Sequence, residues 1–146
     1  MITQNSQIIP QDKHQLHTDA AWKEETKTAG LAWIFTDTNG KRLLQGRKTE
    51  EWVSSPLVAE GLVVREALYQ ARDHGFNSLI FKSDAQILIR AINGTDSIKG
   101  LFGILQDIQN LTCYISDFSF SYVSRSNNTA ADLLVKRALS GLYPAP

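Results

Sequence analysis

The chain has 146 residues, a length that suits one domain built around one hydrophobic core. Its hydrophobic content of 42% is ordinary for a globular protein, and its charged fraction of 21% excludes a disordered chain held open by charge repulsion. The formal net charge is zero, so the basic excess that usually accompanies binding to a polyanion is missing, although a neutral total can conceal a basic face.

The ends of the chain differ in character from its centre. Residues 1–14 are polar and lack the apolar segment of a secretory signal, so we expect an N-terminal tail there. Residues 142–146 contain prolines that cannot extend a helix, and we expect a short C-terminal tail. One domain is therefore expected at residues 15–141.

The single cysteine, Cys113, cannot form an internal disulfide or a cysteine-based zinc site. We expect it to be a small buried hydrophobic residue, and we expect the protein in an intracellular, reducing compartment. No run of residues approaches the roughly 18 apolar residues that a bilayer-spanning helix needs, so no membrane association is expected. The chain is expected to be a monomer.

The first part of the domain predicts three antiparallel strands. The expected strands are Gln15–Ala20, Ala29–Asp37 and Lys41–Lys48. Asn39-Gly40 separates the second from the third, and this pair is a strong hairpin signal because both residues tolerate a positive φ.

A helical period follows the strands. Ser55 is a suitable N-cap, Pro56 suits the first helical position, and Gly75 suits the position just after the helix. Further on, the pattern predicts a strand at Asn77–Ser83, helices at Ala85–Asn93 and Ile98–Leu111, a strand at Asp117–Val123 and a last helix capped by Asn127. The order β-β-β-α-β-α-α-β-α predicts an α/β fold with a mixed five-stranded sheet and helices on both faces.

Four acidic residues fall at particular places in this order. Asp19 closes the first strand, and Asp84 closes the fourth. Glu60 stands one helical repeat before Val64, on the inward face of the first helix, and Asp132 lies in the first turns of the last helix. Each alone has an ordinary interpretation: a turn acid, a helix cap, a solvated helix residue or a partner of the helix dipole. Because carboxyl ends of parallel strands share one rim, Asp19 and Asp84 would be neighbours if their strands pair in parallel.

Taken together, the four carboxylates predict a metal site. Carboxylates that gather at one place repel and raise one another's pKa unless cations neutralise them. Ligands that are all oxygen favour Mg²⁺ or Mn²⁺ over zinc. Two such ions about 4 Å apart can activate a water molecule and stabilise the leaving oxygen in phosphodiester hydrolysis.

Short motifs surround these acids and occur in a fixed order. They are Thr18-Asp19-Ala20, Ala59-Glu60, Ser83-Asp84-Ala85-Gln86 and Arg125-x-x-Asn128-x-x-Ala131-Asp132-Leu133. Over roughly Leu16 to Leu139, this set resembles the type 1 ribonuclease H family. The resemblance is greatest to plant ribonuclease H-like domains that stand alone or end retroelement-type polyproteins.

The resemblance implies a ribonuclease H-like fold and an endonuclease that uses two divalent ions to hydrolyse the RNA strand of RNA–DNA hybrids. It implies that Asp19, Glu60 and Asp84 hold one ion and that Asp19 and Asp132 hold the other. Gln86 and Asn128, which are not among the four acids, match family positions that touch nucleic acid or support the site.

Other residues are candidates for contact with nucleic acid. Arg125 belongs to the last motif. Trp22 and Trp52 fall in predicted loops near the acidic rim. Each could stack on a base or pack within its loop, and the sequence does not decide between these two roles. Trp33 lies inside an apolar strand, and we expect it in the core.

Some features favour a different hypothesis, a catalytically weak or inactive module of retroelement origin that binds nucleic acid or protein. Many family members carry a histidine in the loop before the last helix, whereas no histidine follows His74 here, and Tyr122 or Ser124 occupies that region. A basic, tryptophan-bearing protrusion is also missing. Between the third and fourth acids the cations are Arg90, Lys99 and Arg125.

Overall fold

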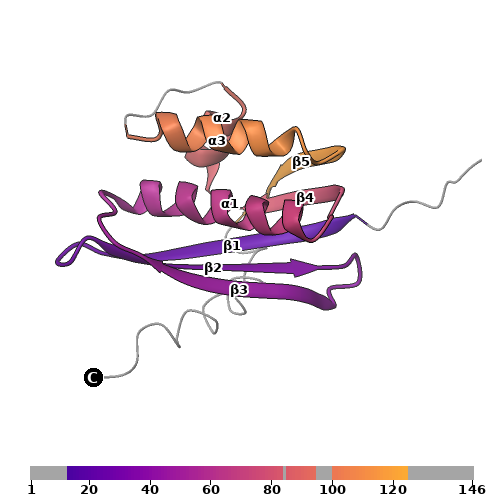
Figure 1. The fold of residues 1–146 in the computed structure, drawn as a ribbon, viewed down its shortest axis with the longest axis horizontal. Helices are drawn as coiled ribbons and strands as arrows, with labels where there is room; N and C mark the ends of the chain where they lie inside the picture. The colour runs from indigo at the N-terminus through magenta and orange to yellow at the C-terminus, as the bar shows by residue number, and fades with distance from the viewer. Residues whose placement is uncertain (1–12, 84, 95–99, 125–146) are drawn as a thin grey trace, which may run out of the picture.

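The computed structural model describes residues 13–83, 85–94 and 100–124, which form a five-stranded mixed sheet with helices packed on it (Figure 1). The strand order across the sheet is β3-β2-β1-β4-β5. The elements are β1 (His14–Lys23), β2 (Thr28–Thr36), β3 (Arg42–Glu50), α1 (Pro56–Asp73), β4 (Ser78–Ser83), α2 (Gln86–Ile92), α3 (Phe102–Thr112) and β5 (Asp117–Tyr122). The predicted order is confirmed over these elements; the last predicted helix, from Asn127, lies outside the described residues.

The first three strands form the expected antiparallel meander, with β2 paired to β1 on one side and to β3 on the other. In the loop after β2, the Asp37 carboxylate accepts hydrogen bonds from the backbone N–H groups of Asn39 and Lys41, each at 2.9 Å. Gly40 takes a positive φ of 84°, whereas Asn39 does not. The predicted turn is therefore present, but an Asp37-centred loop replaces the two-residue turn that the Asn-Gly pair suggested.

Helix α1 begins and ends where its sequence signals predict. The Ser55 hydroxyl accepts a hydrogen bond from the Val58 N–H at 3.1 Å, which satisfies one of the free donors of the first turn. At the other end, Gly75 adopts a φ of 72°, and the Phe76 N–H donates to the Ala71 carbonyl at 2.9 Å. A left-handed glycine just past the helix makes this closing hydrogen bond possible.

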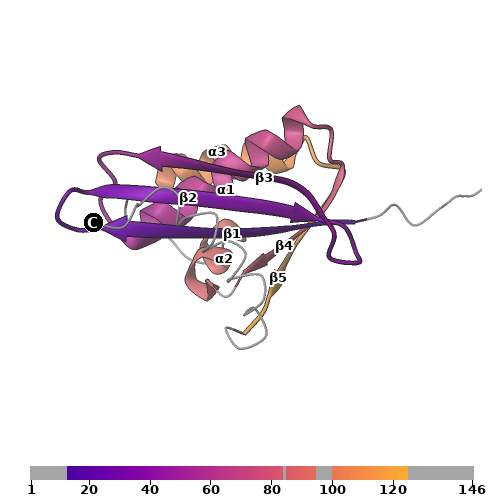
Figure 2. The same cartoon turned by 90° about the horizontal axis from the view of Figure 1, so that it is seen from below.

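The core lies beneath α1, and β2 is buried on both faces. Leu31, Trp33 and Phe35 belong to the cluster that packs against α1, which confirms the expected core position of Trp33. Ala32 and Ile34 alternate with them, point to the opposite face, and are buried as well. Figure 2 shows the strands in front of α1 and α3, which cover the face beyond them.

Helix α3 lies on the outer side of α1, so that α1 is held between the sheet and α3 (Figure 1). Gly61 permits the close approach, because a Cβ there would stand 2.9 Å from a methyl group of Leu101. Arg65 and Asp107 form an ion pair of 2.9 Å across the same interface. Within the described ranges, no helix has the length and apolar character needed to cross a membrane.

The expected burial of Cys113 is wrong. Cys113 is the C-cap of α3 and is exposed to solvent. Helix α3 buries Ile108 and Leu111 instead, and Cys113 follows the last residue of the helix, past this buried face. Its position at a helix end, and not its apolar character, sets its exposure.

Replacing Gly46 by alanine is predicted to destabilise the β2–β3 pair. Gly46 lies opposite Trp33, and a Cβ at Gly46 would stand 2.4 Å from the indole ring. The ring must move out of a packed position, which we expect to cost about 1–3 kcal/mol of unfolding free energy in urea denaturation.

Gly103→Ala is the matched control. A Cβ at Gly103 meets no atom within 4 Å, so the same added methyl group should leave stability unchanged or raise it by up to about 1 kcal/mol. Equal stability of Gly46→Ala and the wild type would contradict the described contact.

Candidate active site

The segment that leads into α1 is tied to the far end of β1. The Trp22 indole N–H donates to the Val53 carbonyl at 2.8 Å, and the Val53 N–H donates to the Lys27 carbonyl at 2.7 Å. The Val53 side chain is buried, which fixes the segment further. These contacts set the first turns of α1 at the end of the sheet where β1 finishes (Figure 1).

Asp19 lies within β1, where it is half-buried and pairs with Ala32 of β2. Its carboxylate accepts a hydrogen bond from the Ala20 N–H at 2.9 Å, which limits its rotation. The predicted end of the strand at Ala20 is wrong, because antiparallel pairing with β2 carries β1 on to Lys23.

Strand β1 is a parallel neighbour of β4, as the predicted site requires. Among the described residues, this pairing runs from His14 opposite Leu79 to His17 opposite Lys82. Asp19 therefore stands just past the last described pair of β1 and β4. In open α/β sheets, such a point at the carboxyl ends of parallel strands is where ligand sites form.

Glu60 lies in the second turn of α1 and is half-buried. It stands one helical repeat before Val64, which is fully buried against the sheet. Helix α1 is therefore present where the prediction needs it, and the inward orientation of the Glu60 carboxylate stays a prediction.

Asp19 and Glu60 approach this end of the sheet from opposite sides. Leu16 and Ala20 contact the core under α1, so strand alternation points Asp19 to the other face. Glu60 comes from the α1 side. Both have interactions within the chain, but the described residues contain no group of three or more His, Cys, Asp or Glu that could hold a metal ion.

The chain on each side of position 84 is held in place. Ser83 is the buried end of β4; its hydroxyl accepts a hydrogen bond from the Ala85 N–H at 2.9 Å, and its carbonyl accepts one from the Val123 N–H at 3.0 Å. Ala85 is the N-cap of α2, without a side-chain cap hydrogen bond. The ordinary interpretation of Asp84 as a helix cap lies outside the described residues.

Several predicted site residues lie outside the described residues. These are Asp84, Arg125, Asn128 and Asp132. Of the predicted contacts with nucleic acid, Gln86 is described: it is the exposed first residue of α2. Its contact stays a prediction, and so do those of Arg125 and Asn128.

His17 precedes Asp19 by two residues in β1. Burial, reinforced by the positive charge of Lys82, lowers the pKa of His17 from 6.5 to about 4. Its Nδ1 is buried and has no hydrogen-bond partner in the described part of the chain. His17 is consequently neutral in neutral and mildly acidic solution and supplies no positive charge to the nearby carboxylate.

The two tryptophans near this end differ. Trp22 belongs to β1 and not to a loop, its indole packs against the core, and the Lys27 ammonium lies 5.1 Å from its ring centroid. Trp22 thus has a packing role, and its contact with nucleic acid stays a prediction. Trp52 is 88% exposed on a backbone with a φ of 62°, which is strained for this residue type. Sequence alone could place Trp52 in a loop but gave no signal of this conformation.

The family model described as reverse transcriptase-like matches residues 17–138. The chain belongs to this reverse transcriptase-like family. No curated protein sequence matches it closely enough to count as a relative.

Solved structures similar to this reverse transcriptase-like domain include ribonucleases H. RNase H1 from the halophilic archaeon Halobacterium salinarum NRC-1 is 23% identical, with a TM-score of 0.76, over 88% of this chain and 98% of that one. LC11-RNase H1, isolated from compost by a metagenomic approach, is 21% identical, with a TM-score of 0.77, over 91% and 99%. The structure of the same protein in complex with an RNA/DNA hybrid is 20% identical, with a TM-score of 0.74, over 90% of this chain and 100% of that one. The fold is therefore ribonuclease H-like, as the sequence predicted.

Removing one carboxylate is predicted to stabilise the protein when no metal is present. Asp19→Asn keeps the oxygen that accepts the Ala20 hydrogen bond but deletes one of the charges that we expect to gather here. In a chelating buffer its melting temperature should rise, corresponding to roughly 0.5–2 kcal/mol.

Millimolar Mg²⁺ or Mn²⁺ should make the melting temperature of the wild type higher than that of Asp19→Asn. The bound ion favours the folded state, and the wild type should bind it more tightly. Glu24→Gln is the charge-matched control, since Glu24 is exposed in the loop after β1. Its metal-induced shift should equal that of the wild type. An equal shift in Asp19→Asn and wild type would show that Asp19 does not bind the ion.

Proposed function

We propose that this domain is a divalent-metal-dependent endonuclease that hydrolyses the RNA strand of RNA–DNA hybrids. The observation that carries the proposal is a pair of half-buried carboxylates in a ribonuclease H-like fold: Asp19 stands just past the last described pair of β1 and β4, and Glu60 lies in the second turn of α1. A similar solved structure, LC11-RNase H1, was determined in complex with an RNA/DNA hybrid.

The donor chemistry of this end of the sheet suits magnesium or manganese. Asp19 and Glu60 offer carboxylate oxygens, which these hard ions prefer, and the one cysteine lies far along the chain at the end of α3. We propose that Asp19, Glu60 and Asp84 hold one ion and that Asp19 and Asp132 hold the second. When bound, the ions would supply an activated water and stabilisation of the leaving oxygen.

The role of this chain's own residues is to orient the carboxylates before the ions bind. The Ala20 N–H holds one oxygen of Asp19. The Trp22–Val53 hydrogen bond and the Ser55 cap fix the start of α1, and with it the depth at which Glu60 reaches toward the sheet. Such fixed ligands spare the site the entropy of ordering side chains when the metal arrives.

Contact with the hybrid is proposed for residues around the same end. Gln86 opens α2 in an exposed position directly after the β4 end. Trp22, Arg125 and Asn128 complete the proposed set. A 2′-hydroxyl presented in the minor groove is the group that would let these residues distinguish RNA from DNA.

A second candidate function is a catalytically weak or inactive module of retroelement origin that binds nucleic acid or protein. Exposed glutamates favour the form of this module that binds protein: Glu24 and Glu25 lie in the loop after β1, and Glu51 lies in the segment before α1. Their negative charge, on a chain with no net charge, opposes the approach of phosphates to the carboxylate end.

Cleavage of a labelled hybrid separates the two functions. In Mg²⁺ or Mn²⁺, the wild type should cut the RNA strand, and Asp84→Asn and Glu60→Gln should each reduce the rate at least about 100-fold because a proposed ligand is lost. Glu24→Gln removes the same charge from an exposed loop and should cleave at least as fast as the wild type.

The decisive contrary result is hybrid binding without cutting in either metal. That outcome would support the second candidate and contradict the enzyme. A binding measurement under the same conditions, such as fluorescence anisotropy of the labelled hybrid, makes the distinction possible.

A further inference from the structure

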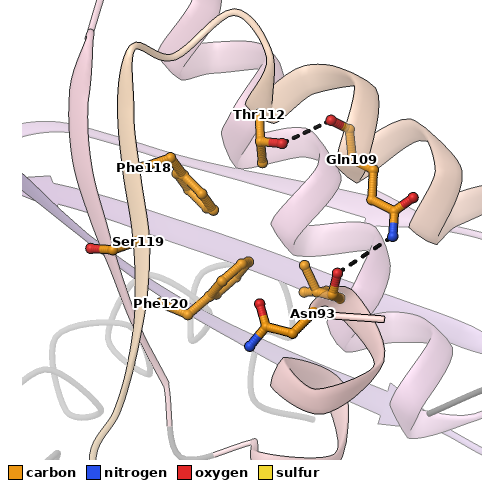
Figure 3. A pocket seen from close by; sticks show the side chains of 7 residues that line it. Asn93, Gln109, Thr112, Phe118, Ser119 and Phe120 are labelled. Atoms are coloured by element: carbon orange, nitrogen blue, oxygen red, sulfur yellow. Dashed lines mark hydrogen bonds between the residues drawn. The ribbon is translucent and has the colours of Figure 1, made fainter. Parts of the chain in front are cut away.

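A pocket of about 400 Å³ lies between β5 and the ends of α2 and α3 (Figure 3). Its lining consists of Ile92, Asn93, Gln109, Thr112, Phe118, Ser119 and Phe120. The volume falls within the range of roughly 300–1,000 Å³ that small-molecule sites occupy. Of the described residues proposed for metal binding or hybrid contact, which are Asp19, Trp22, Glu60 and Gln86, none lines this pocket.

One wall of the pocket is aromatic. Phe118 and Phe120 are two residues apart on β5, so both side chains emerge on the same face, and Figure 3 shows both rings turned toward the helices. Their centroids are 4.8 Å apart at an interplanar angle of 90°. Phe120 also packs edge to face against the buried Phe81, with the two ring centroids 5.5 Å apart. This contact anchors the aromatic wall in the core.

The opposite wall carries hydrogen-bonding groups from the two helices. The Gln109 amide donates to the Ile92 carbonyl at 3.4 Å, which leaves its oxygen as an acceptor. Thr112 donates its hydroxyl hydrogen to the Gln109 carbonyl at 2.8 Å and keeps its lone pairs. Asn93 is exposed at the end of α2, and its carboxamide makes no hydrogen bond in the part of the chain that the structure describes.

Among the described residues, the lining contains no acidic or basic side chain. These residues offer no cation to a phosphate or a carboxylate, and no anion to an ammonium group. The described lining therefore favours a neutral ligand that presents flat apolar faces to the phenylalanines and hydrogen-bond donors and acceptors at its edge.

We propose that this pocket binds a nucleobase, with adenine as the preferred base. Aromatic side chains stack on the faces of unpaired bases. A carboxamide offers one donor and one acceptor side by side, which matches the N7 acceptor and the 6-amino donor of adenine. The exposed carboxamide of Asn93 is the group assigned to this edge. Because neither Asp19 nor Glu60 lines the pocket, this proposal does not rest on hybrid cleavage.

Nuclear magnetic resonance titration of the full chain with adenosine tests the proposal directly. Adenosine carries no phosphate, so the metal site does not take part. The side-chain amide signals of Asn93 and Gln109 and the backbone amides of Phe118 and Phe120 should shift in a saturable manner. Absence of such shifts at millimolar adenosine would overturn the proposal.

Asn93→Ala should weaken adenosine binding at least about fivefold, because the pairing edge is lost. Asn110→Ala is the matched control: Asn110 is an exposed carboxamide on α3 outside the pocket, and it pairs with Gln106. Both variants replace exposed side chains and should fold. Equal weakening by the two variants would contradict the assignment of Asn93.

Two sources could provide the base: a free nucleoside or an unpaired nucleotide in a strand. A short oligodeoxyadenylate is the second probe. If the oligodeoxyadenylate binds more tightly than adenosine, and Asn93→Ala weakens that binding, the source of the base is a strand. If the two probes bind equally well, the pocket recognises the base alone. If the protein cleaves hybrids but adenosine does not bind, the nucleobase proposal fails and the cleavage function stands.

Discussion

The parallel pairing of β1 with β4 is the constraint on which the rest of the structure depends. It joins the antiparallel meander to the second half of the sheet, and it places β1 at the centre of the order β3-β2-β1-β4-β5. Among the described residues the pairing runs to His17, while β1 continues along β2 to Lys23. Asp19 stands just past this pairing, near the carboxyl ends of two parallel strands, where ligand sites form, so the same pairing that builds the core also positions the candidate site.

Local signals in the sequence predicted most of this fold. The start and end of α1 follow from Ser55, Pro56 and Gly75, because caps depend on neighbouring residues alone. The order of elements predicted a mixed sheet, since a helix between strands favours a crossover, but it left the parallel pairing of β1 with β4 as a condition that the structure meets. Features set by distant contacts were missed: β1 extends past Ala20 because β2 pairs with it, and Cys113 is exposed because α3 ends there.

The candidate site was predicted less completely than the fold. Helical spacing predicted that Glu60 lies on the inward side of α1. That Asp19 points to the sheet face away from α1 became visible only with the register of β1 against β2. The left-handed backbone of Trp52 and the convergence of Phe118 and Phe120 with two helix ends depend on tertiary packing. No pattern of a few neighbouring residues encodes them.

The central claim is that Asp19 and Glu60 join Asp84 and Asp132 around two divalent ions. A crystal structure of the protein grown with Mn²⁺, with the ions located by their anomalous scattering, tests this most directly. We expect two ions about 4 Å apart, with Asp19 bound to both and Glu60 bound to one. Manganese bound elsewhere, or carboxylates of Asp19 and Glu60 that share no ion at saturating Mn²⁺, would contradict it.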